Sequence, residues 1–233
     1  MSEFHDPKPL TPLQWAAYSV SIPLVMAVLV FWPAGTLRWA PGWLFLAIFI
    51  AATVVAALVL WRVNPVIFAA RSRVQEGTKR WDRVLLAVFM PLLMAILPVA
   101  GLDVVRFRWL PAPLWAVTLG YALMLAGIAL VTWAQAVNRF FEPGVRIQSE
   151  RGHRVIDTGP YVYVRHPGYV GAIAMFFGMA LSLGSLVALV PAAATTALLV
   201  LRTAWEDETL RRELPGYSDF AAKTRYRLLP GVW

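Results

Sequence analysis

The sequence of 233 residues contains no cysteine, and only 15% of its residues are charged. The absence of cysteine excludes disulfides, thiolate nucleophiles and cysteine-based metal centres. The three histidines, His5, His153 and His166, are scattered along the chain, so the sequence predicts no metal site. A soluble domain carries about 25% charged residues. The low charge therefore indicates a chain with little water-facing surface.

Charge is missing altogether from five long stretches rich in Leu, Val, Ala, Phe and Trp. They are residues 9–37, 39–61, 84–102, 109–138 and 167–201. A helix needs about 20 apolar residues to cross the core of a bilayer. The last stretch is too long for one crossing, and Ser182-Leu183-Gly184-Ser185 at its middle suits a tight turn. We therefore predict an all-α, polytopic integral membrane helical bundle with four spans and a C-terminal transmembrane helical hairpin.

The basic residues gather on one side of this predicted bundle. Of the 21 Lys and Arg residues, 18 fall in residues 1–8, 62–83, 139–165 and 202–233, which the predicted spans place together. Basic loops face the cytoplasm. We expect a multi-pass protein of a bacterial inner membrane, with both termini and the catalytic segments cytoplasmic. The same rule explains the net charge of +8, so no nucleic-acid partner is expected.

Two further patterns concern packing and the membrane surface. Small residues recur four apart in the hairpin, at Ala174 and Gly178 and at Ala180 and Gly184, a spacing that lets helices approach closely. Residues 62–83 combine apolar and basic side chains and suit an interfacial helix. The alternative is that these charges only set the topology and contact lipid headgroups.

Polar functional groups flank the hairpin on both sides. Arg165 and His166 precede it, and Glu206, Asp207 and Glu208 follow it. A helix pair that leaves and returns brings its two ends together, so we expect these groups to lie close to one another. A cation, an imidazole and acids suit a ligand that has both a carboxylate and an amine, such as an amino acid or S-adenosylmethionine.

A structural alternative accounts for the same residues. Arg165 and His166 at a span boundary can extend to the headgroups without binding a ligand. The acidic residues can pair with Arg211 and Arg212 along one helix. Acidic groups beside an anionic membrane surface favour a functional site.

The motif region resembles a known enzyme family. Its elements are Gly159-Pro160-Tyr161, Arg165-His166-Pro167-Gly168-Tyr169-Val170-Gly171, a hydrophobic stretch and Glu206-Asp207-Glu208-Thr209-Leu210. This order resembles the isoprenylcysteine carboxyl methyltransferase family and its phospholipid methyltransferase relatives. The tail, from Leu214 to Phe220 and from Arg225 to Gly231, is similar to the bacterial branch of that family. The resemblance covers about residues 135–233.

The resemblance implies methyl transfer from S-adenosyl-L-methionine to a hydrophobic or lipidic acceptor at the cytoplasmic face. It implies cofactor contacts at Gly159, Tyr161, Arg165, His166, Pro167, Tyr169, Glu206 and Asp207, and catalytic roles for Arg165, His166, Glu206 and Arg227. Two positions depart from the pattern. Asp207 stands where the family often has Glu, and Phe220 stands where Tyr is common.

The chemistry of these side chains suggests a role for each. Arg165 and the helix start after it are expected to hold the cofactor carboxylate, and Glu206 its ammonium or a ribose hydroxyl. Tyr161 or Tyr169 is expected to pack on the adenine or face the sulfonium. Arg225 or Arg227 would orient a carboxylate acceptor. His166 or Glu206 would remove a proton from an amine or thiol acceptor.

The expected reaction is carboxyl O-methylation of an isoprenylcysteine-like substrate, with phospholipid N-methylation or small-thiol S-methylation as alternatives. The non-enzymatic alternative is a membrane scaffold or transporter; the lack of ionisable groups within the five stretches argues against an ion-coupled carrier. The expected partners are a hydrophobic or lipid-linked substrate and membrane lipids. We expect a single domain, in which residues 1–136 form the N-terminal spans and residues 137–233 the cofactor-binding and catalytic half. The sequence leaves the oligomeric state open.

Overall fold

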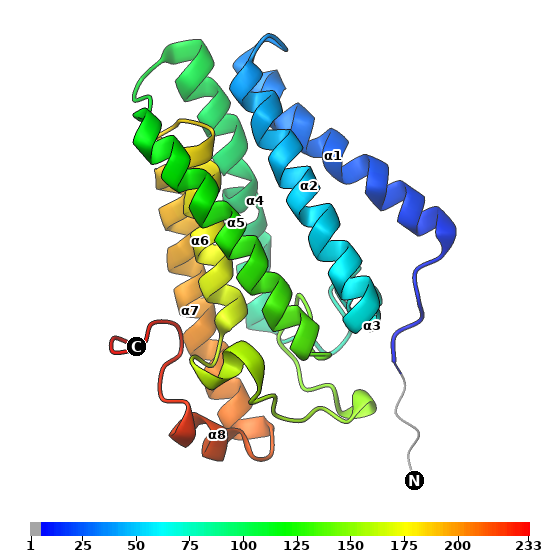
Figure 1. Ribbon diagram of the computed structural model, residues 1–233. Helices are drawn as coiled ribbons and strands as arrows, with labels where there is room; N and C mark the ends of the chain where they lie inside the picture. The colour runs from blue at the N-terminus through cyan, green and yellow to red at the C-terminus, as the bar shows by residue number, and fades with distance from the viewer. Residues whose placement is uncertain (1–5) are drawn as a thin grey trace.

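Long apolar helices stand side by side along one axis in the computed structural model, which describes residues 6–233 (Figure 1). The part of the chain it describes contains no β-strand. The helices are α1 (Pro12–Ala34), α2 (Ala40–Val63), α3 (Val66–Arg71), α4 (Arg80–Gly101), α5 (Leu114–Val137), α6 (Pro167–Ser182), α7 (Leu189–Glu213) and α8 (Tyr217–Lys223). A π-helical turn at Leu102–Phe107 extends α4, and short 3-10 turns lie at Ser149–Arg151 and Gly159–Val162.

Four of the helical segments are long and apolar enough to cross a membrane. They are Pro12–Ala34, Ala40–Val63, Arg80–Phe107 and Leu114–Val137. These correspond to the first four charge-free stretches, and most of their residues face outward from the protein core, as lipid contact requires. The protein is therefore a helical, multi-pass membrane protein.

The fifth charge-free stretch folds into α6 and α7, which turn back on each other where Gly184 was expected to bend the chain. Gly184 adopts a left-handed backbone with φ of 82°, a conformation that glycine tolerates without strain. With 16 residues, α6 is only about 24 Å long. The crossing of the membrane by α6 and α7 stays a prediction.

Glycines explain why α6 lies so close to α5. A Cβ atom at Gly178 would lie 2.4 Å from the backbone nitrogen of Met124, and one at Gly171 would lie 2.7 Å from the carbonyl oxygen of Gly127. Gly178 thus has the packing role predicted for it. Gly184 does not, because it belongs to the turn.

A polar clasp fixes the turn between α6 and α7 at the end of the bundle away from the tail. The buried Asp103 accepts hydrogen bonds from the Ser185 hydroxyl at 2.6 Å and from the Leu110 backbone N–H at 2.7 Å. The clasp joins this turn to the π-helical segment that follows α4.

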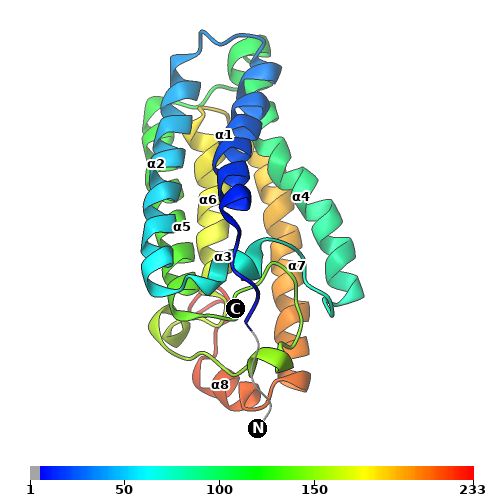
Figure 2. The same ribbon diagram turned by 90° about the vertical axis from the view of Figure 1, so that its right-hand side faces the viewer.

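The polar segments gather at the opposite end of the bundle. The short helix α3, the segment between α5 and α6, and α8 all lie there (Figures 1 and 2). Within residues 62–83 the structure contains one short helix, the six residues of α3; its position at the membrane interface stays a prediction. The apolar part of α7 ends near Leu201, but its helix continues to Glu213 and carries Arg202, Glu206 and Asp207 into the polar layer.

Candidate active site

Arg165, just before α6, and Asp207, near the end of α7, form a buried ion pair. The distance from Arg165 Nε to Asp207 Oδ1 is 2.6 Å, and that from Nη2 to Oδ2 is 3.1 Å. The two residues are 42 positions apart in the chain. The prediction that the motif and the acidic stretch lie together is confirmed.

Asp207 is a hub rather than a free carboxylate. It also accepts hydrogen bonds from the Tyr217 hydroxyl at 2.9 Å, from Arg227 Nε at 3.0 Å and from Arg211 Nε at 3.1 Å. Burial raises the pKa of this carboxyl, but the hydrogen bonds from His166, Arg165 and Arg227 outweigh burial and hold its pKa well below the ordinary value. Asp207 therefore stays ionised and joins α7 to the tail.

Arg165 is equally committed to the protein. Its Nη1 donates to the carbonyl oxygens of Thr224 at 2.8 Å and Arg225 at 2.7 Å, while its backbone N–H donates to Tyr226 at 2.9 Å. Four of the five guanidinium N–H donors are thus used by the protein. This geometry favours a role for Arg165 in docking the tail over the predicted contact with a cofactor carboxylate.

The start of α6 also offers fewer free donors than the sequence suggests. Pro167 has no N–H, and the N–H groups of Tyr169 and Val170 donate to the His166 carbonyl at 3.0 and 3.3 Å. The ring of Phe141 covers Gly168, where a Cβ atom would lie 2.5 Å from a ring carbon. A ligand carboxylate therefore finds little room at this helix terminus.

His166 and Tyr169 form a parallel aromatic pair at the edge of the site. Their ring centroids are 5.5 Å apart and the ring planes differ by 6°. His166 Nε2 lies 3.4 Å from the Tyr217 hydroxyl and 3.5 Å from Asp207 Oδ1. The imidazole is thus oriented by two polar partners, as a group that transfers protons requires.

A second buried ion pair, absent from the sequence predictions, lies next to the first. Arg202 Nε is 2.7 Å from Asp82 Oδ1, and its Nη2 donates to the carbonyl oxygen of Pro143 at 2.6 Å. Its Nη1 donates to the Tyr169 hydroxyl at 2.6 Å, and that hydroxyl donates to Glu206. Arg202 and Glu206 are four residues apart on α7 and so share one face, a spacing that the sequence already contained.

A cavity of about 380 Å³ opens beside this chain of polar groups. Such a volume is within the range of small-molecule sites. Of the predicted site residues, the cavity is lined by Tyr161, Arg165, His166, Tyr169 and Glu206. Its other end is apolar and is lined by Leu86, Phe89, Met90 and Leu93 of α4 and by Met175 and Phe176 of α6.

The other predicted site residues lie outside the cavity lining. Gly159 has φ of 59° and turns the chain against Trp133 and Val137 of α5. Pro167 begins α6, and Asp207 lies behind the cavity wall. The Nε of Arg227 donates a hydrogen bond to Asp207, and the guanidinium carbon of Arg227 lies 4.8 Å from the Trp233 ring centroid. These four residues hold the backbone around the cavity.

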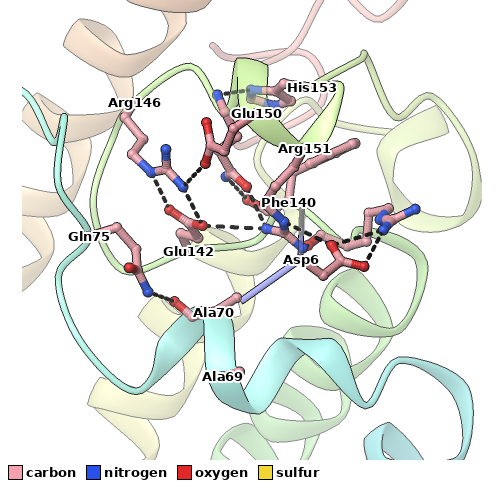
Figure 3. A network of polar contacts seen from close by, with 12 residues as sticks. Asp6, Ala69, Ala70, Gln75, Phe140, Glu142, Arg146, Glu150, Arg151 and His153 are labelled. Carbon is pink, nitrogen blue, oxygen red and sulfur yellow. Dashed lines mark hydrogen bonds and ion pairs between the residues drawn. The ribbon is translucent and has the colours of Figure 1, made fainter. Parts of the chain in front are cut away.

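The segment between α5 and α6 forms one wall of the cavity and is held by ion pairs (Figure 3). Glu142 is buried between Arg146, with Nε at 2.7 Å, and Arg151, with Nη1 at 3.4 Å. Arg151 also reaches Asp6 at 3.2 Å. His153 packs on Phe140, and burial, followed by Arg146 and Arg151, lowers the pKa of His153 to about 4. This wall of the cavity is therefore held in place by ion pairs between its own charged side chains.

Comparison with known proteins finds a similarity over residues that form part of this cavity. Residues 115–215 match the family model described as phospholipid methyltransferase. A comparison with curated proteins finds no match to the chain. The matched residues run from α5 through the Arg165 motif to the end of α7, so they cover both partners of the Arg165–Asp207 pair. The match confirms the predicted resemblance: residues 115–215 of this membrane protein are similar to the phospholipid methyltransferase family.

Proposed function

We propose that this protein transfers a methyl group from S-adenosylmethionine to a lipid-like acceptor at the cytoplasmic surface of the membrane. One observation carries the proposal: a single cavity joins the polar groups of the motif to an apolar lining between α4 and α6. A water-soluble cofactor suits the first end and a hydrocarbon chain suits the second. The family match supports methyl transfer as the reaction.

The polar end of the cavity fits the cofactor by its chemistry. Glu206 is a carboxylate complementary to an ammonium or to ribose hydroxyls, and Tyr161, His166 and Tyr169 offer aromatic faces for an adenine ring or a sulfonium. When bound, S-adenosylmethionine supplies a methyl group that is already activated. The work of the protein is alignment and exclusion of water. Arg165 and Asp207 contribute by fixing the tail and α8 against the motif.

The favoured acceptor is the carboxylate of an isoprenylcysteine-like molecule, which needs no base because it attacks in its ionised form. A phospholipid amine or a small thiol is the alternative, and each must lose a proton. His166 lines the cavity, and its ring is oriented by Tyr217 and Asp207, so it is placed to accept that proton.

The basic segments at the polar end of the bundle suggest how the protein is oriented in the membrane. The helices α3 and α8 lie at one end of the bundle (Figure 1), where the basic segments gather, and residues of these segments line the cavity. We place this end in the cytoplasm, with α6 and α7 forming a transmembrane hairpin. Residues 1–136 and 137–233 then build one domain, because α4 from the first part and α6 from the second line the same cavity.

The test uses the full chain purified in a neutral detergent. Titration calorimetry with S-adenosylmethionine is expected to show binding, and membranes incubated with methyl-labelled cofactor are expected to gain label. Lipid, protein and volatile fractions separate a phospholipid, a prenylated protein and a small thiol as acceptors. A folded protein that neither binds the cofactor nor transfers label would favour the scaffold alternative and overturn the proposal. Binding without transfer to any fraction would also overturn it.

A further inference from the structure

Arg71, the last residue of α3, faces the cavity without a counter-ion. Among residues 6–233, no carboxylate pairs with it and no hydrogen bond from its guanidinium is formed. Its guanidinium carbon lies 5.1 Å from the ring centroid of Phe141. The side chain keeps contact with solvent, and it lines the same cavity as Glu206 and Tyr169. Arg71 is therefore a cation that is placed by the fold and left available.

Two carboxylates of the surrounding segments, those of Glu142 and Asp82, are paired with other arginines. Glu142 is the next residue after Phe141, over whose ring Arg71 lies. Both carboxylate oxygens of Glu142 accept hydrogen bonds from Arg146, and one also pairs with Arg151 (Figure 3). Asp82 is held by Arg202. The positive charge of Arg202 is an unfavourable neighbour for the Arg71 guanidinium. An anionic ligand group would compensate this repulsion.

The position of Arg71 in the chain distinguishes it from the motif residues that line the same cavity. Arg71 lies outside residues 115–215, the segment that matches the methyltransferase family. The helix that follows it, α4, contributes the apolar cavity residues Leu86, Phe89 and Met90. A cation next to an apolar lining complements an anionic amphiphile. The charged head of such a ligand would lie at Arg71 and its hydrocarbon chain along α4.

We propose that Arg71 is the specificity-determining residue that binds the anionic group of the methyl acceptor. The acceptor is accordingly an amphiphile with a carboxylate or a phosphate at its head. A guanidinium binds both groups through paired hydrogen bonds. The inference rests on the proposed function, because it assigns the apolar end of that cavity to the acceptor.

The test compares three single-chain probes on the full chain in neutral detergent: palmitate, hexadecyl phosphate and hexadecanol. Native mass spectrometry measures how much of each stays bound. The wild-type protein is expected to retain at least one of the two anions roughly tenfold better than the alcohol, the size of effect of a charge-assisted pair. Preference for the phosphate indicates a phospholipid acceptor, and preference for the carboxylate indicates a carboxyl-terminated lipid.

Arg71→Met is expected to abolish the preference, while Arg71→Lys keeps part of it because the charge remains without the planar fork. Arg73→Met is the matched control, since Arg73 is exposed, two residues away and outside the cavity lining. Unchanged thermal midpoints show that the variants fold. Equal binding of all three probes to the wild type, or equal losses in Arg71→Met and Arg73→Met, would overturn the proposal.

Cofactor binding separates this proposal from the proposed function. Arg71→Met is expected to bind S-adenosylmethionine with the affinity of the wild type, within about twofold. A parallel tenfold loss of cofactor affinity would mean that Arg71 holds the cofactor carboxylate, and the acceptor assignment would fail. If the wild type binds no cofactor yet discriminates anions through Arg71, the methyltransferase proposal fails while the anion site stands.

Discussion

Arg165 and Asp207 form a bidentate ion pair that joins the start of α6 to the end of α7, with donor–acceptor distances of 2.6 and 3.1 Å. The same carboxylate holds Arg211, Arg227 and Tyr217. One buried side chain thus connects two long helices, α8 and the tail. The contribution of Asp207 to stability can be compared with that of its neighbour Glu208, which is exposed and, among residues 6–233, pairs with Arg212 alone.

Asp207→Asn is expected to lower the free energy of unfolding by about 3 kcal/mol, because it leaves the buried guanidinium of Arg165 without its counter-charge. Glu208→Gln is the matched control and should change it by less than about 0.5 kcal/mol, since exposed ion pairs contribute little. Thermal unfolding of both variants in detergent measures the difference. Equal midpoints for the two variants would show that Asp207 is not the hub that its contacts indicate.

Glu206 differs from Asp207 in that its carboxylate lines the cavity. Glu206→Gln keeps the size of the side chain and an oxygen that accepts from Tyr169, but it removes the charge. We expect cofactor affinity to fall roughly tenfold, because a charge-assisted hydrogen bond to the ligand is lost. The thermal midpoint should stay near that of the wild type. Calorimetric titration checks this, with Glu208→Gln as the control; unaltered affinity in Glu206→Gln would remove Glu206 from the cofactor site.

The Asp82–Arg202 pair joins α4 to α7 beside the cavity. Asp82→Asn leaves the guanidinium of Arg202 without its counter-charge and weakens the acceptor of the Val145 backbone N–H, which donates to Asp82 at 2.7 Å. A loss of about 3–5 kcal/mol in stability is expected. The double variant Asp82→Asn with Arg202→Met should be more stable than the single one, since it removes the unpaired charge. A double variant less stable than Asp82→Asn would contradict this account.

Much of the architecture was predictable because the features that determine it, the charge-free runs and the turn between them, are visible in short segments of the sequence. Charge-free runs of bilayer length predict the four long helices, and the turn at Gly184 predicts that α6 and α7 return to the same end. That return alone is enough to bring Arg165 to Asp207. The basic side chains then mark the end where the polar layer forms.

The partners of individual groups were not predictable. Arg165 donates to the carbonyl oxygens of Thr224 and Arg225, which any residue type could offer, so no sequence pattern records that contact. Asp82 and Arg202 are 120 positions apart and meet only because α4 packs on α7. Arg71 looked like one of several basic residues of an interfacial segment, and only the cavity distinguishes it from Arg73.

His153 gives the cavity wall a dependence on pH. Its pKa is lowered from 6.5 to about 4 by burial and by the positive charges of Arg146 and Arg151. Between these two values the unfolded chain binds a proton that the folded chain does not, so acidification favours unfolding. The stability that the neutral imidazole allows is therefore complete above about pH 6.5 and is lost as the pH falls towards 4.

His153→Gln removes this proton uptake while keeping an acceptor for the Gln148 backbone N–H. From pH 7 to pH 5 the wild type is expected to lose about 1 kcal/mol more stability than the variant, a value below the full linkage term because the side chain is only partly buried. Thermal midpoints of both proteins at the two pH values measure the effect. At pH 7 the variant should be the less stable of the two, since glutamine packs less well on Phe140. An equal loss of stability in both proteins on acidification would place the titrating group elsewhere.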